Sequence, residues 1–372
     1  MKILALEPFY AGSHKEFLDG WKRNSKHEWT ILELPGIKWK WRMRHAPLTY
    51  SKTLINRIAQ NEKWDLIICS SMLSLHELLG FVPELAKIPA IVYFHENQFT
   101  YPLRGESKRD YHYAFTNLLT ASVANEVWFN SEYHKNDFLS AAKTFLSHMP
   151  DYNHLEMISE IETKSIVQHP GIDIIDYHDN ESIENLPLHF VWAARWEFDK
   201  NPEVLYEALL KVKQSGKRFR LSVLGEQYKD SPEVFGNIKT EFSEELCHFG
   251  YLPSREEYLS VLSQSDIYIS TAIHEFFGLS CVEAMSQGCF PMVPKRLAYP
   301  ETVGMLEDNG SNTYFYDGSV DQLTIKLNQL LIEYEKDLLF IKKSKKEISS
   351  AMKVFSWENR AKEMDGRLAK YY

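Results

Sequence analysis

Two glutamates at a fixed interval form the strongest chemical signal in this sequence of 372 residues. Glu275 and Glu283 lie eight residues apart in the segment HEFFGLSCVEAM, where a loop after a short predicted strand enters a helix. At a rise of ~1.5 Å per residue, the two positions are separated by up to ~12 Å along the helix axis. The two carboxylates could therefore hold opposite ends of one extended polar ligand.

The first turn of that helix lies between the two glutamates and has backbone N–H groups without partners inside the helix. Gly278, Leu279 and Ser280 would present them. A helix N-terminus attracts anions, which favours a phosphate at the middle of the ligand. A ligand with hydroxyls at both ends and a diphosphate between them is a nucleotide sugar. The alternative is an acidic cap followed by a surface glutamate.

Two cations follow another predicted strand, in the segment AARWEFDKN. Arg195 and Lys200 would lie at the carboxyl end of that strand, where ligands bind in parallel sheets. They could neutralise the diphosphate that leaves when a glycosidic donor bond breaks. The alternative is a surface pair in which Arg195 contacts Glu197 or Asp199.

A glycine follows the first predicted strand, in the segment FYAGSHKE. Gly12 has no Cβ, so the backbone there can approach a phosphate closely. The segment lacks the G-x-G-x-x-G pattern and does not support a dinucleotide site. An ordinary turn into a helix capped by Ser13 explains the same residues.

Polar side chains also follow the predicted strand AIVYF, in the segment HENQ. These four residues are His95, Glu96, Asn97 and Gln98. A lone histidine is more often structural, but four polar groups at the carboxyl end of a buried strand favour a ligand site.

The segment IKWKWRMRH alternates cations with large apolar residues, although the formal net charge of the chain is −9. The residues concerned are Lys38, Lys40, Arg42, Arg44, Trp39, Trp41 and Met43. In a strand or extended loop, the alternation places the cations on one face and the apolar side chains on the other. The cations could meet phosphates, or an indole could stack on an unpaired base. The alternative is an edge strand protected by charge.

Short apolar runs alternate with helical patterns along the whole chain, which predicts α/β domains with parallel sheets. A polar linker near residues 171–186 divides the chain into two doubly wound, Rossmann-like domains that we expect to face a cleft. The strands are expected in KILAL, WTILEL, DLIICS, AIVYFH, VWFNS, HFVWAAR, FRLSVLG, IYIST and CFPMVP. The helices are expected at 13–23, 52–60, 111–124, 202–214, 255–263, 278–287 and 320–349.

Composition excludes several classes of protein. The four cysteines form no C-x-x-C pair and lie in apolar runs, which predicts buried, reduced thiols in a cytoplasmic protein. No apolar run approaches the roughly 20 residues of a membrane-spanning helix. The sequence contains no D-x-D motif and no histidine or cysteine cluster with metal-ligand spacing, so we expect no metal. The acidic balance restricts nucleic-acid binding to a local patch, and no protein partner is inferred.

The segment around the two glutamates resembles the E-x7-E motif of retaining GT-B glycosyltransferases of the GT4 group. Arg195, Lys200 and the segment QHPGID resemble the diphosphate-binding cations and the hinge of that group. FSWENRAKEM is similar to its C-terminal helix, which returns to the N-terminal domain. The resemblance implies a GT-B fold with an acceptor-binding domain at 1–175, a nucleotide-sugar domain at 176–354 and the returning helix at 355–372.

Three N-terminal segments resemble the tRNA-queuosine α-mannosyltransferase family in particular: EPFYAGSHK, LPGIKWKWRMRH and YFHENQFTYP. An alanine replaces the commoner first glycine before Gly12. The resemblance implies transfer of mannose from GDP-mannose to the cyclopentenediol of queuosine in a tRNA anticodon, with retention and without a metal. The leaving phosphate would help to deprotonate the acceptor hydroxyl.

The resemblance also assigns roles. The catalytic residues would be His95, Arg195, Lys200 and Glu275. Donor contacts would come from Gly12, Arg195, Lys200, Leu252, Glu275, Phe277, Gly278, Leu279 and Glu283. Acceptor contacts would come from Lys38, Trp39, Lys40, Trp41, Arg42, Arg44, Asn97 and Gln98. Two alternatives remain: a GT4 enzyme with another donor and a lipid, polysaccharide or small-molecule acceptor, and a non-catalytic RNA-binding protein on the same scaffold.

Overall fold

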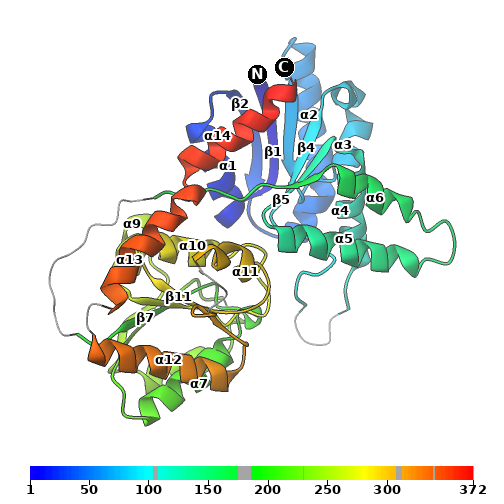
Figure 1. Cartoon of the computed structure of the whole chain (residues 1–372). Helices are drawn as coiled ribbons and strands as arrows, with labels where there is room; N and C mark the ends of the chain where they lie inside the picture. The colour runs from blue at the N-terminus through cyan, green and yellow to red at the C-terminus, as the bar shows by residue number, and fades with distance from the viewer. Residues whose placement is uncertain (104–107, 175–185, 229, 307–311, 338–339, 372) are drawn as a thin grey trace. The chain divides into compact units, whose positions relative to one another are not determined.

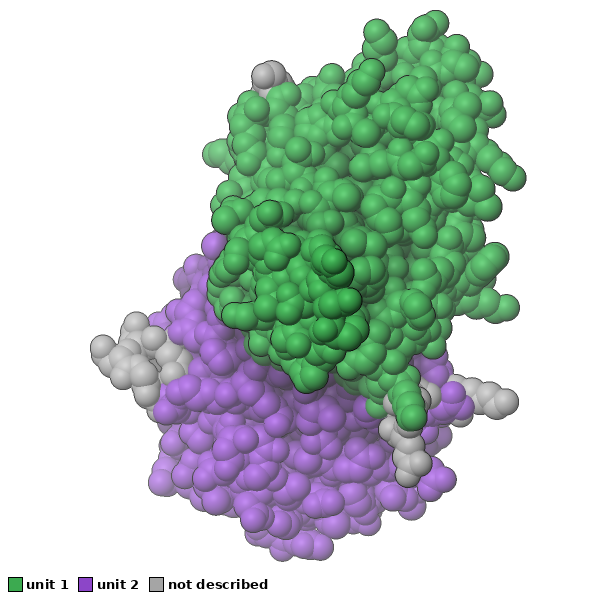
Figure 2. Space-filling view, turned by 90° about the vertical axis from the view of Figure 1, so that its right-hand side faces the viewer, with its two compact units in different colours: residues 1–171, 357–372 green, residues 172–356 purple. Residues whose placement is uncertain are grey.

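The computed structural model describes the chain except for residues 104–107, 175–185, 229, 307–311, 338–339 and 372. It divides into two compact units, shown in different colours in Figure 2. Unit 1 comprises residues 1–171 and 357–372, and unit 2 comprises residues 172–356. The sequence predicted these divisions after residues 175 and 354, and most of the predicted linker lies outside the described residues.

Unit 1 is built on a parallel sheet of six strands in the order β2-β1-β3-β4-β5-β6. Figure 1 labels β1, β2, β4 and β5 of this sheet. The strands are β1 (Lys2–Tyr10), β2 (Glu28–Pro35), β3 (Leu66–Ser70), β4 (Ala90–Phe94), β5 (Glu126–Phe129) and β6 (Ser165–Val167). The helices are α1 (Gly12–Asn24), α2 (Trp39–Ala59), α3 (Leu75–Phe81), α4 (Tyr111–Val123), α5 (Glu132–Ser147), α6 (Glu156–Thr163) and α14 (Trp357–Arg367).

Strand β1 shows why the unit 1 sheet needs helices on both faces. Ile3 and Ala5 pack into one hydrophobic cluster, and Leu4 and Leu6 pack into another. Successive side chains of a strand point to opposite faces, so an unbroken apolar run must be covered twice. The crossover helices provide this cover.

Unit 2 has a second parallel sheet of six strands, in the order β12-β11-β10-β7-β8-β9. The strands are β7 (His189–Ala193), β8 (Arg220–Leu224), β9 (Leu246–Gly250), β10 (Ile267–Ile269), β11 (Phe290–Pro294) and β12 (Phe315–Tyr316). The helices are α7 (Pro202–Gln214), α8 (Val234–Glu241), α9 (Arg255–Ser263), α10 (Leu279–Ser286), α11 (Tyr299–Thr302), α12 (Val320–Lys336) and α13 (Phe340–Ala351). A short 3-10 turn, η2 (Phe198–Lys200), follows β7.

The prediction of two doubly wound α/β domains is confirmed. In each sheet the strand order reverses at one point, between β1 and β3 in unit 1 and between β7 and β10 in unit 2. Ligands of doubly wound folds bind beyond the carboxyl ends of the strands at this switch point. Within the described part of the chain, no helix combines the length and the apolar character needed to cross a membrane.

The prediction of a strand or extended loop at Lys38–Arg44 is wrong, because α2 begins at Trp39. Met43, Ala46, Tyr50 and Leu54 are buried, and their spacing is that of one face of a helix. The alternation of cations and apolar residues covers only the first two turns, so it imitates a strand. Lys38 precedes the helix with a positive φ of 52°.

Three smaller predictions also need correction. Ala11, without a side-chain hydrogen bond, caps α1 in place of Ser13. Two helices, α12 and α13, replace the single one expected at 320–349. Cys247 is exposed, although the other three cysteines are buried as expected.

Helix α14 belongs to unit 1 and contacts it through Trp357 and Asp365. The Trp357 ring fills the space beside two glycines: a Cβ added to Gly20 would lie 2.0 Å from it, and one added to Gly171 would lie 2.3 Å from it. Asp365 of the same helix accepts hydrogen bonds from Trp21 Nε1 at 2.9 Å and from Ser25 Oγ at 2.9 Å. The last helix therefore completes the core around α1.

Replacing Gly20 by Ala tests this packing. We expect urea denaturation to show a loss of about 1–3 kcal/mol, because the added methyl group overlaps the Trp357 ring. Gly80, also helical, is the matched control because a Cβ there meets nothing within 4 Å. The Gly80→Ala variant should be as stable as the parent or gain up to about 1 kcal/mol. Equal effects of the two substitutions would contradict the packing argument.

Candidate active site

Lys200 is the central charge of the unit 2 switch point. It ends the η2 turn, and its Nζ lies 3.3 Å from Glu275 Oε2 and 3.2 Å from Asp199 Oδ2. It also donates a hydrogen bond of 2.8 Å to the His274 carbonyl. Only 10% of the side chain is exposed, so this ammonium depends on its partners for compensation.

Two hydrogen bonds bring the η2 turn to the loop after β10. Thr271 Oγ1 donates to the Lys200 carbonyl at 2.7 Å, and the Ile273 N–H donates to the Asp199 carbonyl at 2.9 Å. The segments after β7 and β10 are therefore joined by one side-chain and one backbone hydrogen bond. These contacts fix the distance between Lys200 and Glu275.

Both members of the ion pair are charged at neutral pH. Burial acts to lower the pKa of Lys200, but the charges of Glu275 and Asp199 outweigh it and raise the pKa. Burial acts to raise the pKa of Glu275, but Lys200, together with the Gly278 N–H, lowers it. The pair can thus act on a ligand without first exchanging a proton.

Arg195 lies nearby in sequence but is more accessible. Its Nη2 is 3.3 Å from Glu197 Oε2, and 48% of its side chain is exposed. The sequence analysis gave this ion pair as the alternative to a diphosphate contact for Arg195. The exposure of the guanidinium also lets it reach an anion that approaches from solvent.

The second glutamate of the motif is placed differently from the first. Glu283 is buried on α10 and accepts a 2.6 Å hydrogen bond from Arg255 Nη2. Gly278 caps α10 with a positive φ of 87°. Phe277 points into the core against Phe355, so it can offer only its backbone to a ligand. Leu252 and Leu279 are half-buried against the same core.

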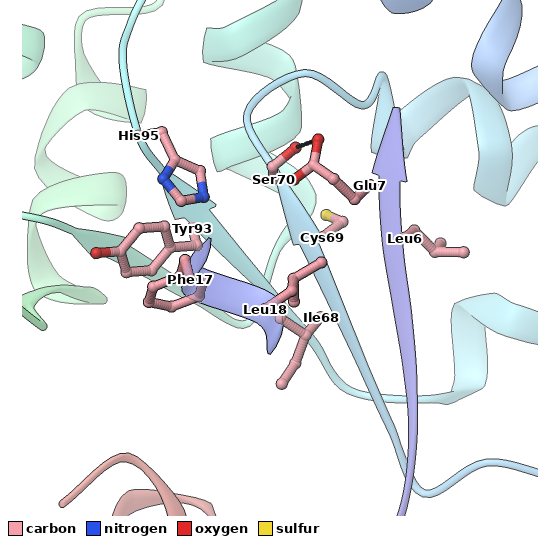
Figure 3. A pocket seen from close by; sticks show the side chains of 9 residues that line it. All are labelled: Leu6, Glu7, Phe17, Leu18, Ile68, Cys69, Ser70, Tyr93 and His95. Atoms are coloured by element: carbon pink, nitrogen blue, oxygen red, sulfur yellow. Dashed lines mark hydrogen bonds between the residues drawn. The ribbon is translucent and has the colours of Figure 1, made fainter. Parts of the chain in front are cut away.

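Unit 1 carries a second group of charges at its own switch point. His14 Nδ1 lies 3.2 Å from Glu7 Oε2, and His14 Nε2 lies 3.0 Å from Glu96 Oε2. Figure 3 shows His95 with Tyr93 across a small pocket from Glu7, which accepts a hydrogen bond of 2.9 Å from Ser70. The elements involved are β1, α1, β3 and the end of β4.

His14 and His95 differ in their protonation states. Burial acts to lower the pKa of His14, but Glu96 and Glu7 raise it to about 10. Burial, and then the charge of His14 and an electrostatic effect of His134, hold the pKa of His95 well below its usual range. His14 is therefore an imidazolium and His95 a neutral imidazole at pH 7.

Glu7, His14 and His95 are the one cluster with metal-compatible spacing in the described part of the chain, with ligand atoms within 4.8 Å of one another. A metal requires a neutral imidazole with a free lone pair. Because both His14 nitrogens face carboxylates, the cluster fits a charged histidine better than a metal ion.

Asn97, one of the predicted acceptor-binding residues, makes its hydrogen bonds within unit 1. It is fully buried, its Oδ1 accepts the N–H groups of Phe99 and Thr100, and its Nδ2 donates to Asp137 at 3.1 Å. Asn97 therefore shapes the loop after β4. Gln98 is 8% exposed, and its backbone N–H donates to Asn117.

The first turns of α2 and α4 together build a surface of cations and aromatic rings. Arg44 lies over the Tyr113 ring at 4.8 Å, Lys40 lies 5.6 Å from the centre of the Trp39 ring, and Trp39 meets Tyr113 edge-on at 5.2 Å. Trp41 is 61% exposed. We call these five residues the α2–α4 patch.

Two other members of the predicted acceptor and donor sets lie in different surroundings. Arg42 is turned back toward the protein, donating to the Pro35 carbonyl at 2.9 Å and contacting His45 at 2.8 Å. Gly12 has a positive φ of 50°, and open space surrounds the place of its missing Cβ. Gly12 thus keeps the geometry that allows close approach of a ligand.

Sequence reasoning missed Glu7, His14 and Asp199 as site residues, and did not select Glu96. Glu7 is a carboxylate at the end of a buried apolar run, and that position was the available signal. His14 had no such signal, because its partners come from two other elements.

The comparisons with known sequences agree in both units. Residues 2–172 match the family model for the N-terminal part of tRNA-queuosine alpha-mannosyltransferase, and residues 174–347 match the model for glycosyl transferases group 1. A tRNA-queuosine alpha-mannosyltransferase from Drosophila melanogaster is 37% identical over 309 residues, which cover 80% of this chain and 81% of that protein.

Solved glycosyltransferases share the GT-B fold. A glycosyltransferase from Rickettsia africae superposes with a TM-score of 0.69 at 16% identity, covering 100% of this chain and 98% of that one. The catalytic domain of starch synthase IV from Arabidopsis thaliana, bound to ADP and acarbose, gives 0.73 at 12% identity, covering 100% and 99%. At these identities the likeness establishes the fold alone.

Replacing His14 by Gln tests the buried charge. The folded-state pKa of His14 is raised from 6.5 to about 10, so its contribution to stability is complete below pH 6.5 and is lost as the pH rises toward 10. We expect the variant to be less stable by about 3–5 kcal/mol at pH 6, with a smaller loss at pH 9.5, in urea denaturation. His148, an exposed histidine of the same unit, is the control. A loss that does not change with pH would contradict the assignment.

Proposed function

Because the chain belongs to the tRNA-queuosine alpha-mannosyltransferase family, we propose that it moves mannose from GDP-mannose to the cyclopentenediol of queuosine in a tRNA anticodon. The observation that carries this proposal is the 37% identity to the Drosophila melanogaster protein over 80% of the chain. The charged groups at both switch points support it, because they lie where doubly wound folds bind ligands. Since tRNA is the acceptor, we place the reaction in the cytoplasm.

Unit 2 is the proposed donor site. Arg195 and Lys200 would bind the diphosphate and stabilise the negative charge that develops as it leaves. Three acceptors surround Lys200 Nζ, so a phosphate oxygen must replace one of them. Glu275 has the longest contact, at 3.3 Å, and would turn to the hydroxyls of mannose.

The remaining donor contacts follow from position. Glu283 would hold the ribose, and backbone N–H groups from Phe277 to Leu279 would meet the phosphates or the sugar. Leu252 would lie beside the nucleobase, and the missing Cβ at Gly12 would let a phosphate approach the backbone closely. His95 would contact the transferred sugar. Protein cations would then perform the charge neutralisation that a metal performs in other transferases, so we propose that the protein requires no metal.

The α2–α4 patch is the proposed contact for tRNA. Cations bind phosphates, and exposed aromatic rings stack on unpaired bases of an anticodon loop. Trp41 is exposed, whereas Trp39 and Tyr113 are half-buried. Lys38, exposed beside the patch, adds a further cation. This local surface allows an acidic protein to bind an acidic polymer.

The direct test is incubation of the protein with labelled GDP-mannose and tRNA. We expect label only in tRNA that contains queuosine, and the same rate with excess EDTA. Transfer to a lipid or oligosaccharide instead of tRNA would contradict the proposed acceptor. Transfer from UDP-glucose but not from GDP-mannose would contradict the proposed donor. Binding of tRNA without any transfer would identify a non-catalytic RNA-binding protein. Abolition by EDTA would contradict the metal-free mechanism.

Replacing Lys200 by Ala should separate catalysis from acceptor binding. We expect kcat to fall by about 10²–10³-fold, because a cation on the leaving diphosphate is lost, while the Kd for tRNA changes less than twofold. Lys211, which pairs with Asp321 on the surface of unit 2, is the matched control. Equal losses in turnover and tRNA binding would place Lys200 at the acceptor.

Replacing Arg44 by Glu should weaken tRNA binding. We expect the Kd to rise at least tenfold and the salt dependence of binding to become shallower, since fewer counterions are released. Lys362, an exposed lysine of unit 1 on α14, gives the same change of charge at a different place. If the Lys362→Glu variant loses as much affinity for tRNA, binding depends on the overall charge of the protein and not on the α2–α4 patch.

A further inference from the structure

The ring of His14 stacks on the ring of His95 inside unit 1. The two centroids are 4.0 Å apart, with 30° between the ring planes. Phe17 meets His95 edge-on at 5.2 Å, and Tyr93 lies at 4.7 Å from it. Three rings therefore hold the His95 imidazole in one orientation.

The backbone of His95 is held as firmly as its ring. Asn130 Nδ2 donates to the His95 carbonyl at 2.9 Å, and Asn130 Oδ1 contacts His134 Nδ1 at 2.8 Å. The loop after β4 is thus tied to the start of α5. His95 has little freedom to turn away from His14.

His14 itself is fixed by ion pairs on both edges of its ring. Glu7 holds one nitrogen and Glu96 the other, and the His14 side chain is 6% exposed. Glu7 is tied down in turn, because its other carboxylate oxygen accepts hydrogen bonds from the Phe9 N–H at 2.8 Å and from Ser70. A buried imidazole with a carboxylate at each nitrogen keeps both of its ring protons. If the imidazole were neutral, the two carboxylates would be buried without a positive partner.

We propose that His14, held between Glu7 and Glu96, is a positioning residue that keeps His95 in its neutral form and in one orientation. A second positive ring stacked at 4.0 Å on the first would be repelled. The charged and titratable groups near His95 are His14 from α1, His134 from α5, Glu7 from β1, Tyr93 from β4 and the adjacent Glu96. His14 is the one stacked on the ring itself.

The consequence for the reaction rests on the proposed function. A neutral imidazole offers one hydrogen-bond donor and one acceptor, which suits a sugar hydroxyl. A charged His95 would instead attract the phosphates of the donor and hold the product after transfer. We infer that His14 prevents His95 from becoming charged and binding phosphate, so that His95 contacts the sugar over the whole neutral pH range.

NMR of protein labelled with ¹³C at the histidine rings tests the inference without any need for activity. In the parent protein we expect His14 to stay doubly protonated at pH 8 and His95 to be neutral at pH 6.5, the ordinary pKa of a histidine. In the His14→Gln variant, the protonation equilibrium of His95 should shift at least tenfold toward the charged form. A His95 signal that titrates identically in the folded variant would overturn the proposal, as would a His14 that is neutral at pH 8.

A second variant covers the case in which His14→Gln does not fold. The Glu96 side chain is 17% exposed, so Glu96→Gln disturbs the packing less. Loss of this carboxylate should make His14 release its proton at lower pH than in the parent, and His95 should then accept one more readily. Unchanged titration of both rings would overturn the proposal.

The pH profile of transfer provides the kinetic measurement. The ratio of kcat/KM at pH 6 to that at pH 7.5 should be near one in the parent and several-fold lower in either variant, because His95 becomes charged at pH 6. A variant with equal losses at both pH values has a structural defect only, and this outcome contradicts the role of His14. If the protein transfers no mannose at all, the proposed function fails while the NMR result still decides the state of His95.

Discussion

A buried cation between two carboxylates occurs at the switch point of each sheet. In unit 1 the cation is His14, between Glu7 and Glu96; in unit 2 it is Lys200, between Asp199 and Glu275. A charge removed from water is tolerated only with partners at close range. Each group of three is therefore interdependent. In unit 1 its members come from β1, α1 and the loop after β4, and in unit 2 from the η2 turn and the loop after β10.

The parallel sheets explain why these charges gather where they do. The central strands β3, β4 and β7 are buried along their whole length, so they leave little place for a charged residue. The first polar side chains after each strand then meet at one edge. A hydrogen bond from the Thr271 hydroxyl and one from the Ile273 N–H, both to main-chain carbonyls of the η2 turn, complete the arrangement in unit 2.

Sequence reasoning succeeded where the signals were local. Helix α7 begins at a proline and helix α9 follows a serine cap, signals that can be read directly from the sequence, and their predicted limits agree with the structure. It failed at α2, where two turns of alternating residues imitated a strand. Sequence reasoning also could not identify contacts between residues that are far apart in the chain. His14 and Glu96 are 82 residues apart, and Lys200 and Glu275 are 75 residues apart. Only the fold brings such partners together.

The attachment of α14 to unit 1 has a consequence for biosynthesis. Trp357 fills the space beside Gly20 and Gly171, yet the ribosome makes it after the whole of unit 2. The unit that is started first is thus finished last, and its core stays incomplete while the second one can already fold. A nascent chain arrested before residue 357 would expose the aromatic surface around Trp21, the kind of surface that chaperones bind.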